Sequence, residues 1–454
     1  MSNSIQTIDQ MISKAQEAAE IMKTFNQEKV DRITEAMMKA GVANERTLAE
    51  MAVEETGIGK VEDKVIKNHH GTQVVYDYMK REKSVGIIDE KDGIIEIAEP
   101  FGIVAAVTPT TNPTSTTMFK SLISLKGRNV IIFAFHPRAQ KCSEAAARIM
   151  QEAAVGAGAP ADCIQWIKEP SVEATTALMK HPCVAIVVAT GGGAMVKAAY
   201  SSGHPALGVG PGNVPVYIEK SANLSLAVES VIASKTFDNG TICSSDQSVI
   251  FDDKAVADKA LALFKERGAY LCTSKEKAML EHVMFDKEKG VPSMRIVGKT
   301  PQFIANLAGF EIPADAKLLM VPLTSVGHDD YMSHEKLSPV LSWFVADSKE
   351  EAISTAVKQL DFGGAGHSAG IFTSDEEIAK EYAMAVPANR VVWNQPAVHG
   401  TIGAIHNTLV PSLTLGCGAR GGNITTDNVG FKNLLNIKRL ARRRIHACNG
   451  NKTP

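Results

Sequence analysis

Short, mostly apolar runs alternate with helix-like stretches from residue 102 onward, and this alternation narrows the possible folds more than any other feature. A continuous apolar run is typical of a strand buried on both faces, whereas a half-exposed strand alternates polar and apolar residues. We therefore predict an α/β fold with parallel sheet covered by helices on both faces. The predicted strands are 103–107, 130–135, 184–189, 215–218, 248–251, 317–321, 370–373 and 390–393, and the predicted helices include 115–125, 143–155 and 194–200.

The segment before residue 102 follows a different pattern. Residues 86–88 and 94–97 form strand-like runs around Asp92-Gly93, which predicts a β-hairpin. A charged, Ala- and Met-rich pattern predicts helix up to about residue 80. Within it, apolar residues at three- and four-residue spacing predict an amphipathic helix over 5–22; they are Ile5, Ile8, Ile12, Ala15, Ala19 and Met22.

Length and composition bound the class of protein. The chain has 454 residues, beyond the roughly 250–300 at which one core stops growing, so we expect at least two domains that share a cleft. Its 48 Lys and Arg nearly balance 50 Asp and Glu, which argues against a nucleic-acid-binding surface. Seven cysteines without a CxxC pair argue against a disulfide framework or a zinc site, and fit a reducing cytoplasm.

The N-terminal residues, the length of the apolar runs and the basic residues near the C-terminus lead to predictions about localisation and subunit contacts. The N-terminus has no basic region followed by an apolar stretch, so we expect no secretory signal. No run of about 20 apolar residues occurs, so we expect no membrane span. A basic cluster, Lys438-Arg439 and Arg442-Arg443-Arg444, is interpreted as a solvated or subunit-contacting tail. We expect a cytoplasmic protein without a bound metal.

Cys243 is the candidate nucleophile. It lies in the polar, turn-prone stretch 236–248, just before the apolar run 249–251. A free cysteine usually behaves as a small buried hydrophobe, but the Asp, Asn, Gly, Ser and Gln residues around this one are poor core residues. We therefore expect Cys243 to be exposed on a loop, where its thiolate can attack a carbonyl carbon.

Two turns after predicted strands carry candidate binding groups. The strand at 184–189 leads through Thr190 into Gly191-Gly192-Gly193 and a helix, so backbone N–H groups can approach a phosphate or a nicotinamide; a plain tight turn also fits. The strand at 103–107 leads into 108–114, where Asn112 precedes a proline and is held extended. Its amide can donate to a developing oxyanion, although a simple turn residue fits as well.

Three more segments contain candidate groups. Glu335 can accept from ribose hydroxyls and His334 can move a proton, but surface residues at a strand entry also fit. The segment 208–213 is rich in glycine, which suits either a loop or the passage of a bulky group. The segment 411–423 is similar and adds Arg420 as a candidate anion contact.

The order and spacing of these motifs are more specific than any one of them. They are TPTTNPTST, IIFAFHPRA, ATGGGAMVKAAYSSG, GVGPGN, SKTFDNGTICSS, HEKLSP and PSLTLGCG. From about residue 5 to about residue 440, the chain resembles the CoA-acylating branch of the aldehyde dehydrogenase superfamily. It is most similar to the aldehyde dehydrogenase half of bifunctional aldehyde-alcohol dehydrogenases. The chain ends where those proteins continue into an iron-dependent alcohol dehydrogenase domain, so we expect neither alcohol formation nor its metal.

The resemblance implies an aldehyde dehydrogenase-like architecture. It consists of two doubly wound parallel-sheet domains with a β-hairpin oligomerisation arm at about 85–99. We expect a cofactor-binding domain at 1–211, a catalytic domain with the nucleophilic cysteine at 212–405, and a returning, subunit-contacting segment at 406–454. We also expect a homo-oligomer, either a dimer or a tetramer.

The resemblance also implies roles for individual residues. Cys243 is the nucleophile, and Asn112 stabilises the oxyanion together with the backbone N–H of Cys243. His334 has a proton-transfer role, while Pro137 and Arg138 fall near the adenosine of the cofactor. NAD or NADP is expected against Thr108, Pro109, Thr110, His136, Thr190, Gly191, Gly192, Gly208, Glu335 and Leu337, with Glu335 on the nicotinamide ribose.

One departure bears on the reaction. Hydrolytic relatives carry a Glu general base in an E-L-G-G pattern, where this chain has Gly208-Val209-Gly210. Gly208 cannot accept a proton, so water is poorly activated, whereas the thiol of coenzyme A is an intrinsically better nucleophile. We therefore expect an acyl-CoA product, and we expect these glycines to leave room for the pantetheine arm.

The sequence leaves open which aldehyde is the substrate and whether the cofactor is NAD or NADP. Acetaldehyde is the first candidate because the nearest resemblance is to acetaldehyde-forming enzymes. However, the chain has GCGARG where close relatives have GCGSWG, and Arg420 fits a carboxylate or sulfonate, as in succinic semialdehyde or sulfoacetaldehyde. A CoA phosphate or a neighbouring subunit fits Arg420 equally, and Arg138 is compatible with NAD or NADP.

Three other functions remain open. A hydrolytic aldehyde dehydrogenase shares the fold but needs the missing Glu. A cysteine acyltransferase or hydrolase without nicotinamide is opposed by the glycine turn and Glu335. A structural role, in a filament or inside a protein shell, is opposed by the lack of a separate N-terminal targeting helix and linker.

Overall fold

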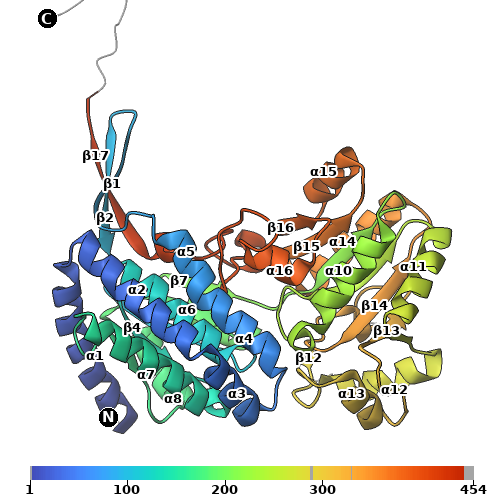
Figure 1. Ribbon diagram of the computed structural model, residues 1–454, viewed down its shortest axis with the longest axis horizontal. Helices are drawn as coiled ribbons and strands as arrows, with labels where there is room; N and C mark the ends of the chain where they lie inside the picture. The colour runs from blue at the N-terminus through green and yellow to red at the C-terminus, as the bar shows by residue number, and fades with distance from the viewer. Residues whose placement is uncertain (1–2, 287–289, 329, 444–454) are drawn as a thin grey trace, which may run out of the picture.

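Two parallel sheets organise the chain, one in each of the two lobes in Figure 1. The computed structural model describes residues 3–286, 290–328 and 330–443. The strand order is β5-β4-β3-β6-β7 in the first sheet and β10-β13-β14-β9-β8-β15-β16 in the second. All neighbouring pairs in both sheets are parallel, which confirms the predicted fold class.

The two sheets occupy different parts of the sequence, although the predicted domain boundaries themselves stay predictions. The pattern does not predict β5, β7 and β10, because runs of three or four residues carry too little periodicity to be recognised. The strands of the two sheets are β3 (Ile103–Val107), β4 (Val130–Ala134), β5 (Ile164–Trp166), β6 (Val184–Thr190), β7 (Ala206–Val209), β8 (Val214–Ile218), β9 (Asp246–Phe251), β10 (Ala269–Leu271), β13 (Leu318–Pro322), β14 (Val340–Val345), β15 (Gly366–Phe372) and β16 (Ala388–Trp393).

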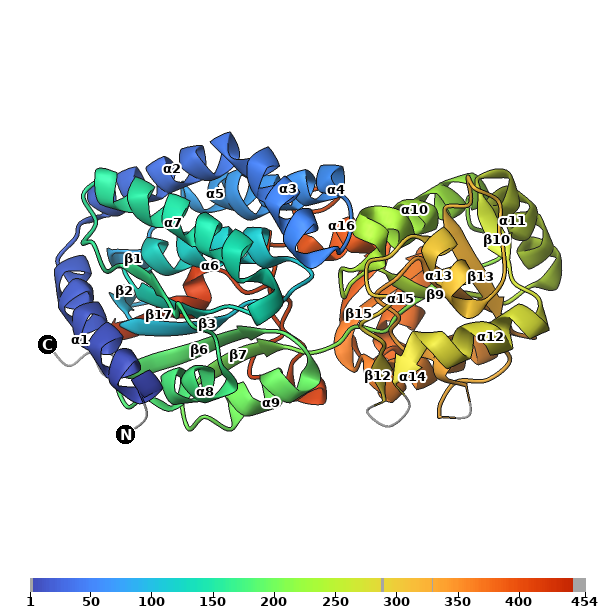
Figure 2. The ribbon, with the colours of Figure 1, turned by 90° about the horizontal axis from the view of Figure 1, so that it is seen from below.

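Helices cover both faces of the first sheet. In Figure 2, α6 and α7 lie on one side of it, and α1, α8 and α9 lie on the other. Those of the first lobe are α1 (Asn3–Lys23), α2 (Gln27–Ala43), α3 (Glu45–Thr56), α4 (Val61–His69), α5 (Val75–Met79), α6 (Pro113–Lys126), α7 (Gln140–Gly156), α8 (Val172–Lys180) and α9 (Gly193–Tyr200). Those that follow are α10 (Leu224–Thr236), α11 (Lys254–Glu266), α12 (Ser274–Met284), α13 (Pro301–Ala308), α14 (Lys349–Gly363), α15 (Glu376–Ala385) and α16 (Ala397–Ile402).

Helix α1 follows the predicted amphipathic pattern. Ile8, Ile12, Ala15 and Met22 are buried in the core of the first lobe, and Ala19 packs against that core while partly exposed. The predicted contact of the Ile5 side chain lies outside the described residues. The apolar stripe therefore attaches the first helix to the sheet by ordinary hydrophobic burial.

The predicted hairpin is present as β1 (Gly86–Lys91) and β2 (Ile94–Pro100). Asp92 and Gly93 have φ angles of 53° and 79°, which is the pair of positive φ values that a type I′ turn requires. The strand β17 (Leu435–Ala441) pairs antiparallel with β2. Figure 1 shows this three-stranded sheet extending away from the first lobe.

The basic cluster near residue 440 faces acidic residues of the hairpin. Arg439 pairs with Glu96 at 2.9 Å, Arg442 pairs with Glu90 at 2.8 Å, and Lys438 pairs with Glu99. Arg444 lies outside the described residues. Because these side chains are exposed or partly exposed, the pairs contribute little to stability, and their main effect is to select the strand register.

A short connection joins the two sheets. Strand β7 ends at Val209 and β8 begins at Val214, so residues 210–213 cross directly from one lobe to the other. The buried Asn213 fixes this crossing, because its amide nitrogen donates to the backbone oxygens of Ser333 (2.9 Å) and Gln359 (3.0 Å). Within the described ranges, no helix has the length and apolarity needed to cross a membrane.

Gly366, the first residue of β15, allows a close backbone crossing. Its φ is +78°, and a Cβ there would lie 1.8 Å from the carbonyl oxygen of Cys417. We expect Gly366→Ala to destabilise the protein by at least about 2 kcal/mol, since backbone strain alone costs about 1–3 kcal/mol. Thermal denaturation with Gly156→Ala as control tests this, because Gly156 ends α7 with nothing within 4 Å of an added Cβ. Equal melting temperatures for the two variants would contradict the assignment.

Candidate active site

Cys243 lies in the loop between α10 and β9, but the polar residues around it are buried. Cys243 itself is partly exposed, whereas Asp238, Ser244 and Gln247 are 0% exposed, so the expectation of an exposed loop is wrong for this segment. Polar side chains can be buried here because they bond to one another and to the backbone. Gln247, for example, donates to the carbonyl oxygen of Ser245 at 2.9 Å.

The turn before Cys243 is left-handed. Asp238, Asn239 and Gly240 have φ angles of 48°, 52° and 70°. Asp, Asn and Gly are the residues that tolerate this conformation best, which explains the DNG sequence. Asn239 also donates to the carbonyl oxygen of Gly298 at 2.9 Å. The turn therefore fixes the backbone from which the cysteine projects.

His367 on β15 contacts the thiol directly. Its Nε2 lies 3.2 Å from Sγ of Cys243, and its Nδ1 lies 3.0 Å from Oγ of Ser368. The sequence interpretation missed this histidine, because its only signal was a single titratable residue within the small-residue run 363–370. The structure thus places His367, on a strand far along the chain, beside the candidate nucleophile.

Both members of this pair are neutral at pH 7. Burial raises the pKa of the Cys243 thiol to about 12, and the nearby Glu335 charge adds to this effect. Burial also lowers the pKa of His367 to about 3, together with the positive charge of Arg390. The Arg390 guanidinium binds the backbone, because it donates to the carbonyl oxygens of His367 (2.9 Å) and Gly416 (2.7 Å). The neutral imidazole can therefore accept a hydrogen bond from the neutral thiol, and the thiol proton can pass to it only as the sulfur bonds to carbon.

Asn112 caps α6 with φ −138° and ψ 55°, at the carboxyl end of β3. Its Oδ1 accepts from Nζ of Lys67 at 2.6 Å, and its Nδ2 donates to Oγ1 of Thr111 at 3.3 Å. Lys67 is buried and also contacts Asp238, the first residue of the left-handed turn before Cys243. The predicted oxyanion amide and the predicted nucleophile are thus linked through one lysine.

Glu335 and Gly212 meet next to the cysteine. Oε1 of Glu335 accepts from the Gly212 N–H at 2.9 Å, and burial raises the pKa of this carboxyl to about 8. A Cβ on Gly212 would lie 2.0 Å from the Cys243 carbonyl oxygen and 3.2 Å from Cε1 of His367. Glu335 is 4% exposed, so it is a buried residue of the site rather than a surface residue.

The turns after β3 and β6 lie side by side, because Val107 pairs with Ala189. Gly192 and Gly193, at the N-terminus of α9, have nothing within 4 Å of an added Cβ. Oγ1 of Thr108 is buried without a hydrogen-bond partner among the described residues, and Oγ1 of Thr190 lies 3.5 Å from that of Thr414. An open glycine turn, a helix N-terminus and an unpaired hydroxyl fit a nicotinamide dinucleotide.

Gly208 does not open a passage. A Cβ there would lie 2.8 Å from Val196 and 2.9 Å from Tyr200, and its N–H donates to the Tyr200 hydroxyl. Gly210, in contrast, has nothing within 4 Å of an added Cβ. The expected room at Gly208 is therefore wrong, because α9 packs against β7 there, and the open space lies at Gly210.

The other predicted residues take varied positions. The His334 ring packs edge-on to Phe362 at 5.2 Å, and its Nδ1 lies 3.4 Å from the Glu335 carbonyl oxygen. His136 is exposed after β4, and its Nδ1 accepts from the Arg138 N–H at 3.1 Å. Arg420 is exposed on a short 3₁₀ turn. Thr110 is buried, while Pro109 and Leu337 are half-buried.

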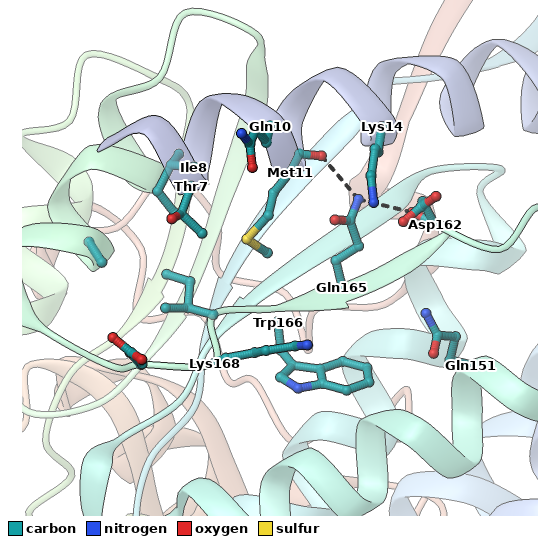
Figure 3. Close-up of a pocket in the computed structure, with 13 residues that line it drawn as sticks. Thr7, Ile8, Gln10, Met11, Lys14, Gln151, Asp162, Gln165, Trp166 and Lys168 are labelled. Carbon is teal, nitrogen blue, oxygen red and sulfur yellow. Dashed lines mark hydrogen bonds between the residues drawn. The ribbon is translucent and has the colours of Figure 1, made fainter. Parts of the chain in front are cut away.

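A separate hollow of about 580 Å³ lies between α1, β5 and α8. Figure 3 shows Met11 and Lys14 of α1 on one side of it and the Trp166 ring on the other. Gln165 spans the hollow by donating to the Met11 carbonyl oxygen at 3.1 Å. None of the predicted site residues lines it, so it is distinct from the Cys243 region.

Comparison with known proteins agrees with this geometry. A model of the aldehyde dehydrogenase family matches residues 2–405. The aldehyde-alcohol dehydrogenase of Streptococcus pneumoniae is 50% identical over 406 residues, which cover 87% of this chain and 46% of that protein. The acetylating succinate-semialdehyde dehydrogenase of Clostridium kluyveri is 39% identical over 97% of this chain and 96% of its own.

Solved structures show the same similarity. The acetylating aldehyde dehydrogenase of Geobacillus thermoglucosidasius has a TM-score of 0.95 and 47% identity, with 98% of both chains covered. An engineered glycolyl-CoA reductase solved with bound NADP+ has a TM-score of 0.84 and 25% identity, covering 96% of both chains.

The chain spans about half the length of the aldehyde-alcohol dehydrogenases that it matches. The family match covers most of the chain, and the resemblance is confirmed. The chain belongs to the aldehyde dehydrogenase family.

Proposed function

We propose that this protein is a CoA-acylating aldehyde dehydrogenase. It converts a short-chain aldehyde, CoA and NAD(P)+ to acyl-CoA and NAD(P)H, reversibly, through a thioester on Cys243. The observation that carries this proposal is the 3.2 Å contact between the thiol and a histidine that burial keeps neutral. A neutral imidazole at this distance can take the thiol proton as the sulfur adds to the aldehyde carbon, and it can later do the same for the thiol of CoA.

The first step adds Cys243 to the carbonyl carbon. Nε2 of His367 accepts the thiol proton in the tautomer whose Nδ1–H donates to Oγ of Ser368, which lies 3.0 Å away. The S–C bond forms as the C=O π electrons move to oxygen. Asn112 and the Cys243 N–H donate to that oxyanion, and one such donor lowers the barrier by about 3–4 kcal/mol.

When bound, the nicotinamide cofactor supplies the hydride acceptor. Thr190, Gly191 and Gly192 would hold it at the N-terminus of α9, and Glu335 would accept from its ribose, with Thr108 as a further hydroxyl contact. The carboxyl of Glu335 is oriented by the Gly212 N–H.

CoA then discharges the thioester. His367 first releases to solvent the proton that it took from Cys243, which is the H+ formed in the overall reaction. It then accepts the CoA thiol proton as the new S–C bond forms, and it gives this proton to the Cys243 sulfur as the bond to Cys243 breaks. Gly210 supplies the open space for the pantetheine arm. The glycine at 208 leaves no carboxylate there to activate water, which disfavours release of a free acid.

We propose acetaldehyde as the first substrate to test. Arg390 is a cation near Cys243, but its guanidinium donates to backbone oxygens, and Arg420 is exposed. These positions favour a small neutral aldehyde over an anionic one. The acetylating relative that acts on succinate semialdehyde keeps anionic aldehydes as the second candidate.

We also propose a cytoplasmic homo-oligomer whose subunits meet through the β1-β2-β17 sheet. That sheet projects from the first lobe (Figure 1) and presents exposed apolar side chains at Ile87 and Leu440. A protein built this way is expected to elute as a dimer or tetramer.

Strict CoA dependence is the expected result of the deciding assay. Initial rates of NAD(P)H formation are measured with acetaldehyde, propionaldehyde, succinic semialdehyde and sulfoacetaldehyde, each with and without CoA. Cys243→Ala serves as the control and should lose at least about 10³-fold in rate while keeping cofactor binding and melting temperature. Turnover without CoA would mean a hydrolytic enzyme, and no NAD(P) reduction at all would mean a cysteine enzyme of another kind.

The reactivity of Cys243 should rise continuously with pH. Because burial raises its pKa to about 12, the thiolate fraction increases about tenfold per pH unit throughout the range below that value. Alkylation by iodoacetamide, followed by mass spectrometry of the Cys243 peptide, should therefore show no plateau between pH 7 and pH 10. An ordinary thiol levels off near pH 8.5–9, and that behaviour would contradict the assigned environment.

Replacement of His367 tests its role as the base. We expect His367→Gln to reduce acyl transfer to CoA by about 10²–10⁴-fold, the usual contribution of a general base. Stopped-flow mixing of the acylated enzyme with CoA measures this step, and cofactor binding provides the control. Wild-type transfer rates at pH 7 would eliminate His367 and return the proton-transfer role to His334.

A further inference from the structure

Two lysines on α4 reach the same carboxylate from the first lobe. Lys64 and Lys67 are 2% and 4% exposed, and both form ion pairs with Asp238, which is 0% exposed. Figure 2 shows the end of α4 at the side of the first lobe that faces α16 and α10. The ion pairs therefore join the helix to the left-handed turn that precedes Cys243.

Asp238 is fully engaged by these partners. Its Oδ1 accepts from the Lys60 N–H at 2.7 Å, and its Oδ2 accepts from Oγ1 of Thr241 at 2.9 Å. Burial disfavours the charged carboxylate, but the two ammonium groups hold the Asp238 pKa below its ordinary value. Burial lowers the pKa of Lys67 to about 8, and the Asp238 charge opposes this effect.

The two lysines differ in their remaining contact. Nζ of Lys67 donates to the side-chain Oδ1 of Asn112 at 2.6 Å, and it also contacts Thr241 at 3.2 Å. Nζ of Lys64 donates instead to the backbone oxygen of Thr111 at 2.9 Å. Only Lys67 touches the amide group that the proposed mechanism uses.

An ammonium group can only donate, so it distinguishes the two ends of a carboxamide. With Oδ1 of Asn112 held on Lys67, the NH₂ group must point the other way, and a flipped amide would place two donors against each other. One of the two N–H groups lies toward Oγ1 of Thr111 at 3.3 Å. The second N–H is the donor that the proposed mechanism assigns to the oxyanion.

We propose that Lys67 is a positioning residue that locks the Asn112 carboxamide in its donating orientation and ties it, through Asp238 and Thr241, to the turn before Cys243. The two oxyanion donors come from loops attached to different sheets, and this buried bridge holds them as one unit. The inference rests on the proposed function, because it assigns the orientation of a group in that site.

The test uses Lys67→Met with Lys64→Met as a matched control. Each variant removes one buried ammonium partner of Asp238 from the same helix, so both should lower the melting temperature similarly. Only Lys67→Met should slow the pre-steady-state burst of NADH, by about 10–10²-fold, since removal of a complete oxyanion donor costs about 10²–10³-fold. The KM for aldehyde and the Kd for the nicotinamide cofactor should stay close to wild type in both.

A double variant separates this inference from the proposed function. Asn112→Ala alone should slow the burst, and Lys67→Met combined with Asn112→Ala should be no slower than Asn112→Ala alone. The positioning role would be overturned if Lys64→Met and Lys67→Met reduced the burst rate equally. It would also be overturned if Lys67→Met combined with Asn112→Ala slowed the burst by the product of the two single effects. A wild-type burst in Asn112→Ala would instead refute the oxyanion role itself.

A second pair of variants covers the case in which Lys67→Met does not fold. Asp238→Asn is then combined separately with Lys67→Met and with Lys64→Met, so that neither protein contains a buried carboxylate that has lost one of its two ammonium partners. Both double variants carry the same effect of Asp238→Asn on the turn. The ratio of their burst rates therefore still measures the contact between Lys67 and Asn112. A ratio near one would overturn the proposal.

Discussion

Close backbone approach is the constraint on which the site depends. Gly212 leaves no space for a side chain against the Cys243 carbonyl, and Gly366 leaves none against that of Cys417. The first contact joins the crossing between the sheets to the nucleophile loop, and the second joins the C-terminal segment to the strand that carries His367. Contacts this close place a thiol, an imidazole and a carboxyl from three separate segments within one small region.

The electrostatics of the site favour neutral groups until a reaction begins. The Cys243 thiol and the Glu335 carboxyl have raised pKa values, and the His367 imidazole has a lowered one. Activation therefore comes from proton transfer over a short contact rather than from a standing thiolate. An uncharged thiol is also less prone to oxidation and to unwanted alkylation between turnovers.

Much of the fold could be predicted from the sequence, because long apolar strands and amphipathic helices carry strong periodicity. The hairpin followed from Asp92-Gly93, and Cys243, Asn112 and Glu335 followed from motif order. His367 could not be found this way, because it contacts Cys243 from a strand more than a hundred residues later in the chain. The exposure of the Cys243 loop was misjudged, since composition does not reveal that buried polar side chains have partners.

The pairing of β17 with β2 has a consequence for how the chain is made. Strand β2 precedes both parallel sheets, whereas β17 follows them, so the partner of β2 emerges from the ribosome after the entire second lobe. Until then, one side of the hairpin remains an open edge with unpaired N–H and C=O groups, which is a template for association with other chains. Nascent molecules are therefore most prone to misassembly before β17 has been synthesised and has paired with β2.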